Sequence, residues 1–378
     1  MSMAYEHAGE CVDMQPASSA NLPEYGSLSA YGRFYTERIE SRSRPFPHIR
    51  RTRMDLIIET PADARKALRD VISEVARAVV GYEQTIFDFM VALSAGEHIL
   101  LEGVPGIAKT TLSKSVAKAM AIDFNRIQFT QDLLPTDITG HNYYNQLTKQ
   151  FEMRKGPVFT ELLLADEINR APPKTQSALL ESMQEKQVTI EGSTLKLPEL
   201  FMVVATLNPI ETEGVYPLPE AQIDRFMLKI KMDYPDEDDE LTILSLKNLF
   251  EEEPQSVMTR ENVLQLRKLC FNVHAHRSIL TYINGITRAT RSRENVELGL
   301  SPRGGIHLLE SSKGRALLSG RPYVIPDDVK AMAHAVMDHR LMLSPEAELE
   351  GLTAGGITES ILSEVPVPKG DFGEDKKR

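Results

Sequence analysis

The chain of 378 residues contains only two cysteines, Cys11 and Cys270, which do not have the spacing of metal ligands. We therefore expect neither a disulfide framework nor a cysteine zinc site, and two plain thiols fit a reducing cytoplasm. No apolar run approaches the roughly 20 residues that a membrane-spanning helix needs. The N-terminal residues lack an apolar stretch followed by a small-residue cleavage site, so we expect no signal peptide. These absences predict a cytoplasmic protein without a membrane span.

Positive charges are fewer than negative charges. Lys and Arg number 43 against 54 Asp and Glu, which gives a net charge of -11 and a pI near 5.4. This balance disfavours a general nucleic-acid binder, although it leaves room for a local basic patch. The hydrophobic fraction of 42% and charged fraction of 26% are typical of globular proteins, and the length suffices for two domains.

Residues 1–54 lack a sustained apolar period and are rich in Ser, Tyr, Pro and Arg. Between positions 33 and 53 there are only two acidic residues, Glu37 and Glu40, but seven arginines, at positions 33, 38, 42, 44, 50, 51 and 53. Such a segment cannot bury enough apolar surface to offset its ordering entropy, which favours a disordered leader. A docking arm for an acidic partner or an anionic membrane is the alternative.

Residues 55–235 have the pattern of an α/β domain. A helical spacing of apolar residues begins at Ala62, and a second apolar helix follows at about 84–93. The apolar run 98–102 then predicts a buried strand, which leads through a glycine-rich loop into a helix from Lys109 to Met120. Further strands are predicted at 126–129, 162–165 and 201–206, with a helix at 175–185. Alternating strands and helices indicate a parallel sheet.

The character of the chain changes near Pro235. The acidic run 236–240 favours a helix start, because carboxylates stabilise the positive end of a helix dipole. From this run onward the pattern predicts a smaller, all-helical domain over 236–345. Residues 346–378 are expected to form a C-terminal tail, which is polar and contains prolines from about Glu364.

The glycine-rich loop has the residue types of a phosphate-binding loop. Successive backbone N–H groups that lead into a helix N-terminus form an anion cradle. Lys109 can reach the β- and γ-phosphates of ATP, and the Thr110 hydroxyl can ligate Mg²⁺. A glycine-rich turn without a ligand is the alternative, but the preceding strand and following helix favour the nucleotide site. The predicted nucleotide-binding residues of the loop are Gly103, Val104, Pro105, Gly106, Ile107, Ala108, Lys109, Thr110 and Thr111.

A second part of this site is predicted after the strand 162–165. Asp166 and Glu167 follow this apolar run, and ligands of open α/β sheets bind at the carboxyl ends of the strands. Asp166 is expected to hold Mg²⁺, largely through water, and Glu167 to orient and deprotonate the attacking water. Acidic residues also occur commonly at strand ends as solvated groups. Their distance from Lys109 leaves room for an intervening helix, strand and inserted hairpin, which favours the catalytic interpretation.

Three ordered blocks resemble the MoxR family of AAA+ ATPases. They are GVPGIAKT at 103–110, LLADEINRAPPKTQSALLESMQE at 163–185 and GVYPLPEAQIDRF at 214–226. The general phosphate loop has glycine where this chain has Ala108, but MoxR-like chains usually show GxPGxAKT. The resemblance covers about residues 56–345 and implies a P-loop domain with a smaller helical lid.

The resemblance also implies roles outside the two motifs. Asn208 corresponds to sensor 1, which positions water near the γ-phosphate, although Asn208-Pro209 is also a turn signal. Arg225 corresponds to the arginine finger for the neighbouring subunit's site, with an ordinary surface or capping arginine as the alternative. Arg303 corresponds to sensor 2 on the lid. Val80 and Gly81 resemble the segment that borders the adenine.

Two inserted hairpins are expected, at about 138–157 and 188–197, and they resemble inserts that face the pore or a partner in related rings. Aromatic gripping by His141, Tyr143 and Tyr144 is one interpretation, and solvated hairpin residues are the commoner one. Arg170 is a further trans-acting candidate, for which a salt bridge with a local carboxylate is equally compatible with the sequence.

The resemblance therefore implies a Mg²⁺-dependent ATPase that works as a chaperone and remodels or assembles protein complexes. A closed ring is expected, a hexamer in this family, with a von Willebrand factor A domain protein as partner and an unidentified client. Three alternatives remain at this point: a chelatase-like motor subunit for metal insertion, a nucleic-acid motor or loader, and a nucleotide-gated adaptor with slow turnover.

Overall fold

The computed structural model describes residues 56–209, 214–247, 253–370 and 372–373. The expected leader 1–54 lies outside this range. The first described helix, α2 (Pro61–Val75), begins in a capping box, because Thr60 Oγ1 accepts a hydrogen bond from the Asp63 N–H and the Asp63 carboxylate accepts one from the Thr60 N–H. Helix α3 (Glu83–Ala95) follows and is buried along most of its length.

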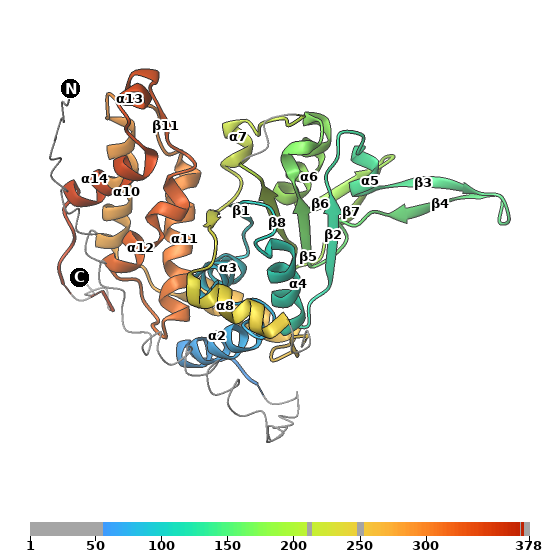
Figure 1. The fold of residues 1–378 in the computed structure, drawn as a ribbon, viewed down its shortest axis with the longest axis horizontal. Helices are drawn as coiled ribbons and strands as arrows, with labels where there is room; N and C mark the ends of the chain where they lie inside the picture. Colours follow the sequence, from blue (N-terminus) through green and yellow to red (C-terminus); the bar gives the residue numbers. More distant parts are fainter. Residues whose placement is uncertain (1–55, 210–213, 248–252, 371, 374–378) are drawn as a thin grey trace, which may run out of the picture. The chain divides into compact units, whose positions relative to one another are not determined.

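The centre of the α/β domain is a five-stranded parallel sheet with the order β2-β5-β8-β1-β9 (Figure 1). Its strands are β2 (Phe124–Gln128), β5 (Leu162–Asp166), β8 (Met202–Leu207), β1 (Ile99–Gly103) and β9 (Leu228–Met232). The predicted strands at 98–102, 126–129, 162–165 and 201–206 are confirmed, with shifts at their ends. Strand β9 was not predicted.

The central strands are buried on both faces, which explains why β1, β5 and β8 read as continuous apolar runs. The side chains of successive strand residues point to opposite faces of the sheet and belong to two separate hydrophobic cores. Ile99, Leu164 and Val204 belong to the core shared with the lid helices, whereas Leu163 and Val203 belong to the core on the opposite face. The domain also contains α4 (Lys109–Ala119), α5 (Pro135–Thr139), the short 3-10 helix Ile168–Arg170, α6 (Pro173–Glu185) and α7 (Glu220–Ile223).

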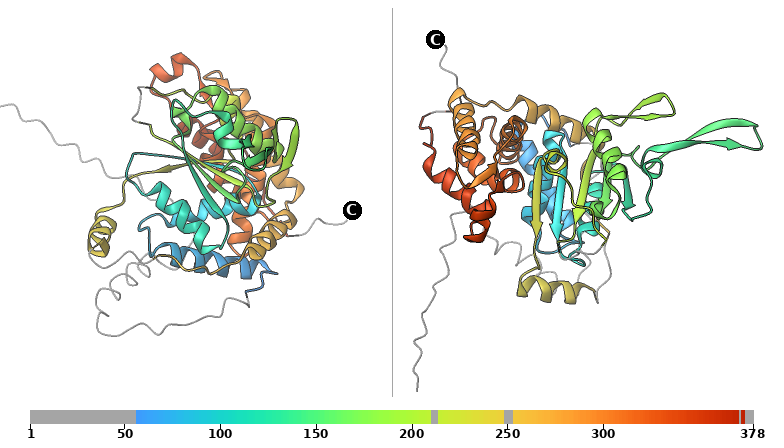
Figure 2. Two further views of the ribbon diagram at one scale, coloured as in Figure 1. Left: turned by 90° about the vertical axis from the view of Figure 1, so that its right-hand side faces the viewer. Right: turned by 90° about the horizontal axis from the view of Figure 1, so that it is seen from above.

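Two antiparallel hairpins extend from this domain, as predicted. They are β3–β4 (Gly140–Asn145 and Gln150–Lys155) and β6–β7 (Gln187–Ile190 and Ser193–Lys196). They lie side by side (Figure 2), joined by a hydrogen bond of 2.8 Å from Asn142 Nδ2 to Glu191 Oε2. On β3, Tyr143 donates its hydroxyl to Glu152 at 2.9 Å, and Tyr144 packs edge-on against Phe151.

After α8 (Glu237–Lys247), the second domain is mainly helical, as expected. Its helices are α9 (Arg260–Asn272), α10 (Arg277–Arg291), α11 (Pro302–Leu318), α12 (Pro326–Met337), α13 (Pro345–Leu349) and α14 (Ala354–Glu364). It also contains a small antiparallel pair, β10 (Val296–Leu298) and β11 (Met342–Leu343), so the expectation of an all-helical domain was wrong in this detail.

The helical packing continues past the expected boundary at residue 345. Helix α14 lies in the segment interpreted as a tail, yet it packs against α10 and α12 and buries Ile357, Ile361 and Leu362. Glycines at its start and prolines after its end hide its apolar period in the sequence. Helix α11 packs against α3, α10 and α12, so the lid core and the first face of the sheet are continuous. Across the described ranges, every helix is too short or too polar to cross a membrane.

Candidate nucleotide-binding site

The carboxyl ends of β1, β5 and β8 bring the predicted phosphate-binding residues together. In the register of the parallel strands, Glu102 pairs with Leu207 and Ala165 pairs with Ala205. The last residues of the three strands, Gly103, Asp166 and Leu207, therefore lie at the same edge of the sheet. Parallel α/β proteins bind ligands at this edge. The first residue of α4, Lys109, folds back over the loop, and its Nζ contacts the carbonyl oxygens of Gly103, Val104 (3.2 Å) and Leu207 (3.5 Å).

The last residue of β1, Gly103, has no room for a side chain. A Cβ built on Gly103 would stand 2.6 Å from the Met232 carbonyl oxygen and 2.4 Å from Ile107 Cδ1, so a larger residue cannot occupy this position without displacement of the backbone. Ala108 has φ 61°, a left-handed conformation that costs a residue with a side chain about 1–2 kcal/mol. The departure from the general motif therefore stores strain at the start of α4.

Replacing Ala108 with glycine should raise the free energy of unfolding by up to about 1 kcal/mol, because the relief of left-handed strain in the folded state exceeds the added entropy of the unfolded chain. Urea unfolding of the full chain measures this change. Ala121, which follows α4 with φ 50°, is the matched control, and Ala121→Gly should stabilise the chain similarly. Stabilisation by Ala121→Gly together with a loss of stability in Ala108→Gly would contradict strain at Ala108.

Asp166 is held at the end of β5 by neighbouring strands. Its Oδ1 accepts a hydrogen bond of 2.6 Å from Thr206 on β8. Its Oδ2 lies 3.2 Å from Thr110 Oγ1 and accepts hydrogen bonds of 2.8 and 3.0 Å from Arg126 on β2. The two residues expected to hold Mg²⁺, Thr110 and Asp166, therefore lie in direct contact. Arg126 was not predicted, because an arginine on an edge strand resembles a solvated residue in the sequence.

Glu167 stands one residue beyond Asp166 in a left-handed conformation, with φ 57°. Its N–H donates to Thr206 Oγ1 at 2.8 Å, which ties the turn to β8. Its carboxylate accepts a hydrogen bond of 2.6 Å from Gln128 Nε2 and forms an ion pair of 3.0 Å with Arg170. The local salt bridge considered for Arg170 is thus present, and both contacts are made by the same carboxylate oxygen, Oε2.

The residues fit a Mg²⁺–nucleotide complex. Mg²⁺ prefers hard oxygen ligands, commonly one or two carboxylates with water and substrate phosphates, and the hydroxyl–carboxylate pair Thr110–Asp166 belongs to this class. Asn208 is buried directly after Leu207, whose carbonyl oxygen contacts Lys109.

Val80 and Gly81 lie between α2 and α3, and Val80 is buried. Gly81 has φ +85°, and a Cβ at this position would stand 2.5 Å from Asp239 Oδ2 on α8. Burial and the neighbouring carboxylates Asp236 and Glu83 raise the pKa of Asp239. The start of α8 therefore covers the segment expected to border the adenine.

Comparison with known proteins agrees with this geometry. Residues 98–228 match the model of the ATPase family associated with various cellular activities (AAA), and residues 288–361 match the AAA lid domain. The chain is 40% identical to Chaperone MoxR1 of Mycobacterium tuberculosis over 311 residues, which span 80% of this chain and 82% of that protein. This chain belongs to the MoxR family of AAA+ ATPases.

Other relatives support the same placement. The uncharacterised protein YeaC of Bacillus subtilis is 46% identical over 308 residues, or 81% of this chain and 96% of YeaC. The crystal structure of a protein from Cytophaga hutchinsonii assigned as an ATPase superimposes with a TM-score of 0.77 at 43% identity. That match covers 82% of this chain and 97% of the other. The predicted P-loop domain with a helical lid is thus confirmed as the MoxR-type fold.

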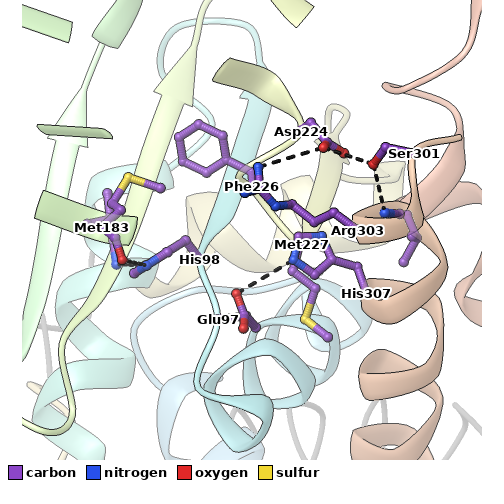
Figure 3. A network of polar contacts seen from close by, with 12 residues as sticks. Glu97, His98, Met183, Asp224, Phe226, Met227, Ser301, Arg303 and His307 are labelled. Carbon is purple, nitrogen blue, oxygen red and sulfur yellow. Dashed lines mark hydrogen bonds and ion pairs between the residues drawn. The ribbon is translucent and has the colours of Figure 1, made fainter. Parts of the chain in front are cut away.

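Two arginines that the MoxR resemblance singled out lie in a different group of residues. Arg225 follows α7, and its Nη1 donates to the Leu180 carbonyl oxygen of α6 at 2.8 Å. Arg303 on α11 forms a loose ion pair of 3.8 Å with Asp224, and 42% of its side chain is exposed (Figure 3). The structure thus brings Arg303 to Asp224, beside Arg225, whereas Lys109, Asp166, Glu167 and Asn208 gather at the sheet edge.

Proposed function

We propose that this protein hydrolyses ATP with Mg²⁺ and works as a ring-forming MoxR-type chaperone that remodels or assembles protein complexes. The observation that carries the ATPase proposal is the convergence of Lys109, Asp166 and Glu167 on one edge of the parallel sheet. In this proposal Lys109 and the loop N–H groups hold the phosphates, and Thr110 and Asp166 hold Mg²⁺. The bound Mg²⁺ would neutralise charge that develops on the phosphate oxygens.

Glu167 is the proposed general base and Asn208 the residue that helps to position water. Glu167 is half-buried, and its carboxylate is held by the neutral Gln128 amide and the cationic Arg170. These two contacts fix the position of the carboxylate at the end of β5, which supports its proposed role beside the phosphate-binding loop.

A ring follows from the proposed role of Arg225. Its guanidinium contacts the Leu180 carbonyl oxygen of α6, and we propose that it instead completes the nucleotide site of a neighbouring subunit, whereas Arg303, paired with Asp224, would act as sensor 2 on the lid. If each subunit supplies Arg225 to the nucleotide site of one neighbour and receives Arg225 from the other neighbour, the subunits form a closed ring. The MoxR resemblance makes six subunits the proposed number and a von Willebrand factor A domain protein the proposed partner. We propose the cytoplasm as its location.

The chaperone proposal is supported by the similarity to Chaperone MoxR1. The net charge of -11 disfavours the nucleic-acid motor, and no feature of the described residues favours metal insertion or a slow adaptor over remodelling. The test is phosphate release from Mg²⁺–ATP by the purified chain, together with its mass in solution with and without ATP. Turnover in a ring-sized species is expected. Absence of turnover across a range of protein concentrations would contradict the ATPase proposal.

Arg126→Gln should lower the Mg²⁺ concentration that half-saturates nucleotide binding. Arg126 donates two hydrogen bonds to Asp166 Oδ2, the same oxygen that approaches Thr110. Because 47% of the arginine side chain is exposed, the pair contributes about 0.2–1 kcal/mol, or roughly a 1.4- to 5-fold change in affinity. Titration of a fluorescent ATP analogue against Mg²⁺ measures the change, with Arg154→Gln on β4 as a control. An increased Mg²⁺ requirement would contradict competition at Asp166.

A further inference from the structure

Arg340 is a buried arginine of the lid with an unusually complete set of partners. It follows the end of α12 and is 7% exposed. Its guanidinium donates to the carbonyl oxygens of Asp224 (3.1 Å), Phe226 (2.5 Å) and Met227 (3.2 Å). These carbonyls belong to the segment 224–227, which joins α7 to β9 in the sheet domain. Arg340 therefore connects the lid to the backbone on both sides of Arg225.

The Asp224 side chain strengthens this connection. Its Oδ1 accepts a hydrogen bond of 2.8 Å from Arg340 Nε. Its Oδ2 accepts one of 3.0 Å from the hydroxyl of Ser301, the N-cap residue of α11, and faces Arg303 at 3.8 Å (Figure 3). One carboxylate thus binds the start of α11 and the end of α12.

Two histidines complete the surroundings of Arg340. His307 Nδ1 lies 2.6 Å and His339 Nε2 lies 2.7 Å from the guanidinium. Burial and the charge of Arg340 lower the pKa of His307 to about 3 and also lower the pKa of His339, so both rings are neutral near pH 7 and accept hydrogen bonds. Removing one partner of a buried ion pair is strongly unfavourable, because it leaves an uncompensated charge. The contact is therefore expected to persist when the lid moves.

We propose that Arg340 is a positioning residue that makes the lid and the segment 224–227 move as one body, so that the lid of one subunit sets the position of Arg225 at its neighbour's ATP site. The proposal rests on the proposed trans role of Arg225. Because Arg340 holds the carbonyls of Asp224 and Phe226, a shift of the lid is passed to the main chain of the residue between them. A displacement of about 1 Å at a catalytic group can lower a rate on the order of 100-fold.

The experiment uses two full copies of the chain linked in tandem, so that variants alternate around the ring. The donor copy carries Glu167→Gln and supplies Arg225, and the receiver copy carries Arg225→Ala and supplies Glu167. Arg340→Lys is then added to one copy at a time. In the donor it should lower kcat on the order of 10- to 100-fold with little change in KM for ATP, whereas in the receiver it should change kcat less than about twofold.

Equal losses from both placements would overturn the proposal, since a merely structural role acts on either copy. No loss in the donor would also overturn it. Arg321→Lys in the donor is the matched control, because Arg321 binds Asp328 through two hydrogen bonds within the lid and should leave kcat unchanged. If Arg340→Lys lowers the melting temperature sharply, Asp224→Asn replaces it and should show the same donor-specific loss. An inactive parent tandem chain would instead contradict the trans role of Arg225.

Discussion

Replacing Glu167 with glutamine is expected to lower kcat for ATP hydrolysis by roughly 10²–10⁴-fold, the range of a lost general base. ATP binding should remain within about twofold, because glutamine has nearly the same shape and the proposed phosphate contacts lie on the loop 103–111. The backbone N–H of residue 167 keeps its bond to Thr206, so the turn is preserved. Phosphate release and fluorescent ATP titration measure the two effects separately.

Lys109→Ala is the contrasting control for this experiment. Lys109 Nζ contacts the carbonyl oxygens of the loop and would face the β- and γ-phosphates of bound ATP. Loss of this amino group should therefore weaken ATP binding rather than turnover alone. Parental turnover in Glu167→Gln would remove Glu167 from the catalytic role. A parallel loss of ATP binding in Glu167→Gln would indicate a damaged turn instead of a missing base.

Arg225→Ala is expected to lower kcat by roughly 10³–10⁵-fold, the range known for arginine fingers, while ATP binding at its own site persists. To reach a neighbouring subunit, the guanidinium must leave the Leu180 carbonyl oxygen, which it contacts at 2.8 Å. Arg225→Lys is the control for the charge, and it should recover little activity because a finger uses the planar guanidinium fork. Steady-state hydrolysis by assembled rings is the measurement.

The Arg303→Ala variant is a useful comparison with Arg225→Ala, because Arg303 pairs with Asp224, the residue next to Arg225. The ion pair of Arg303 with Asp224, at 3.8 Å, is longer than the Arg340–Asp224 hydrogen bond of 2.8 Å. Arg303→Ala should therefore change kcat for ATP hydrolysis while the Arg340–Asp224 contact remains. Full activity in Arg225→Ala rings would assign Arg225 to the local structural role that its contact with Leu180 allows. Arg170 would then become the next trans candidate, although it forms an ion pair with Glu167 of its own subunit.

The phosphate loop and the acidic strand end could be predicted because their chemistry is local. A strand, a glycine-rich turn and a helix start lie within about a dozen residues, and Asp166 directly follows a continuous apolar run. Strand β9 lacks a continuous apolar run, but lysines alternate with its buried Leu228, Ile230 and Met232, which is the period-2 pattern of a strand and could have predicted it. Its membership of the sheet depends on pairing with β1, which lies far away in the sequence.

The partners of the site could not be predicted for a similar reason. Gln128 and Arg126 meet Glu167 and Asp166 through the pairing of β2 with β5, and edge-strand residues read as solvated in the sequence. Arg340 lies 116 positions from Asp224, and nothing in Asp338-His339-Arg340 suggests a buried cation. The family resemblance identified Arg303, but its position beside Asp224 depends on how the lid packs against the sheet domain.

The measurement that most directly tests a shared ATP site is hydrolysis by the parent tandem chain, with Glu167→Gln in one copy and Arg225→Ala in the other. Each variant alone should be nearly inactive. In the alternating ring, every receiver site keeps its own Glu167 and obtains Arg225 from the adjacent donor, so about half of the sites should be complete. The predicted result is ATPase activity well above that of either separate variant. A tandem ring that assembles, binds ATP and shows no gain over the two variants would contradict it.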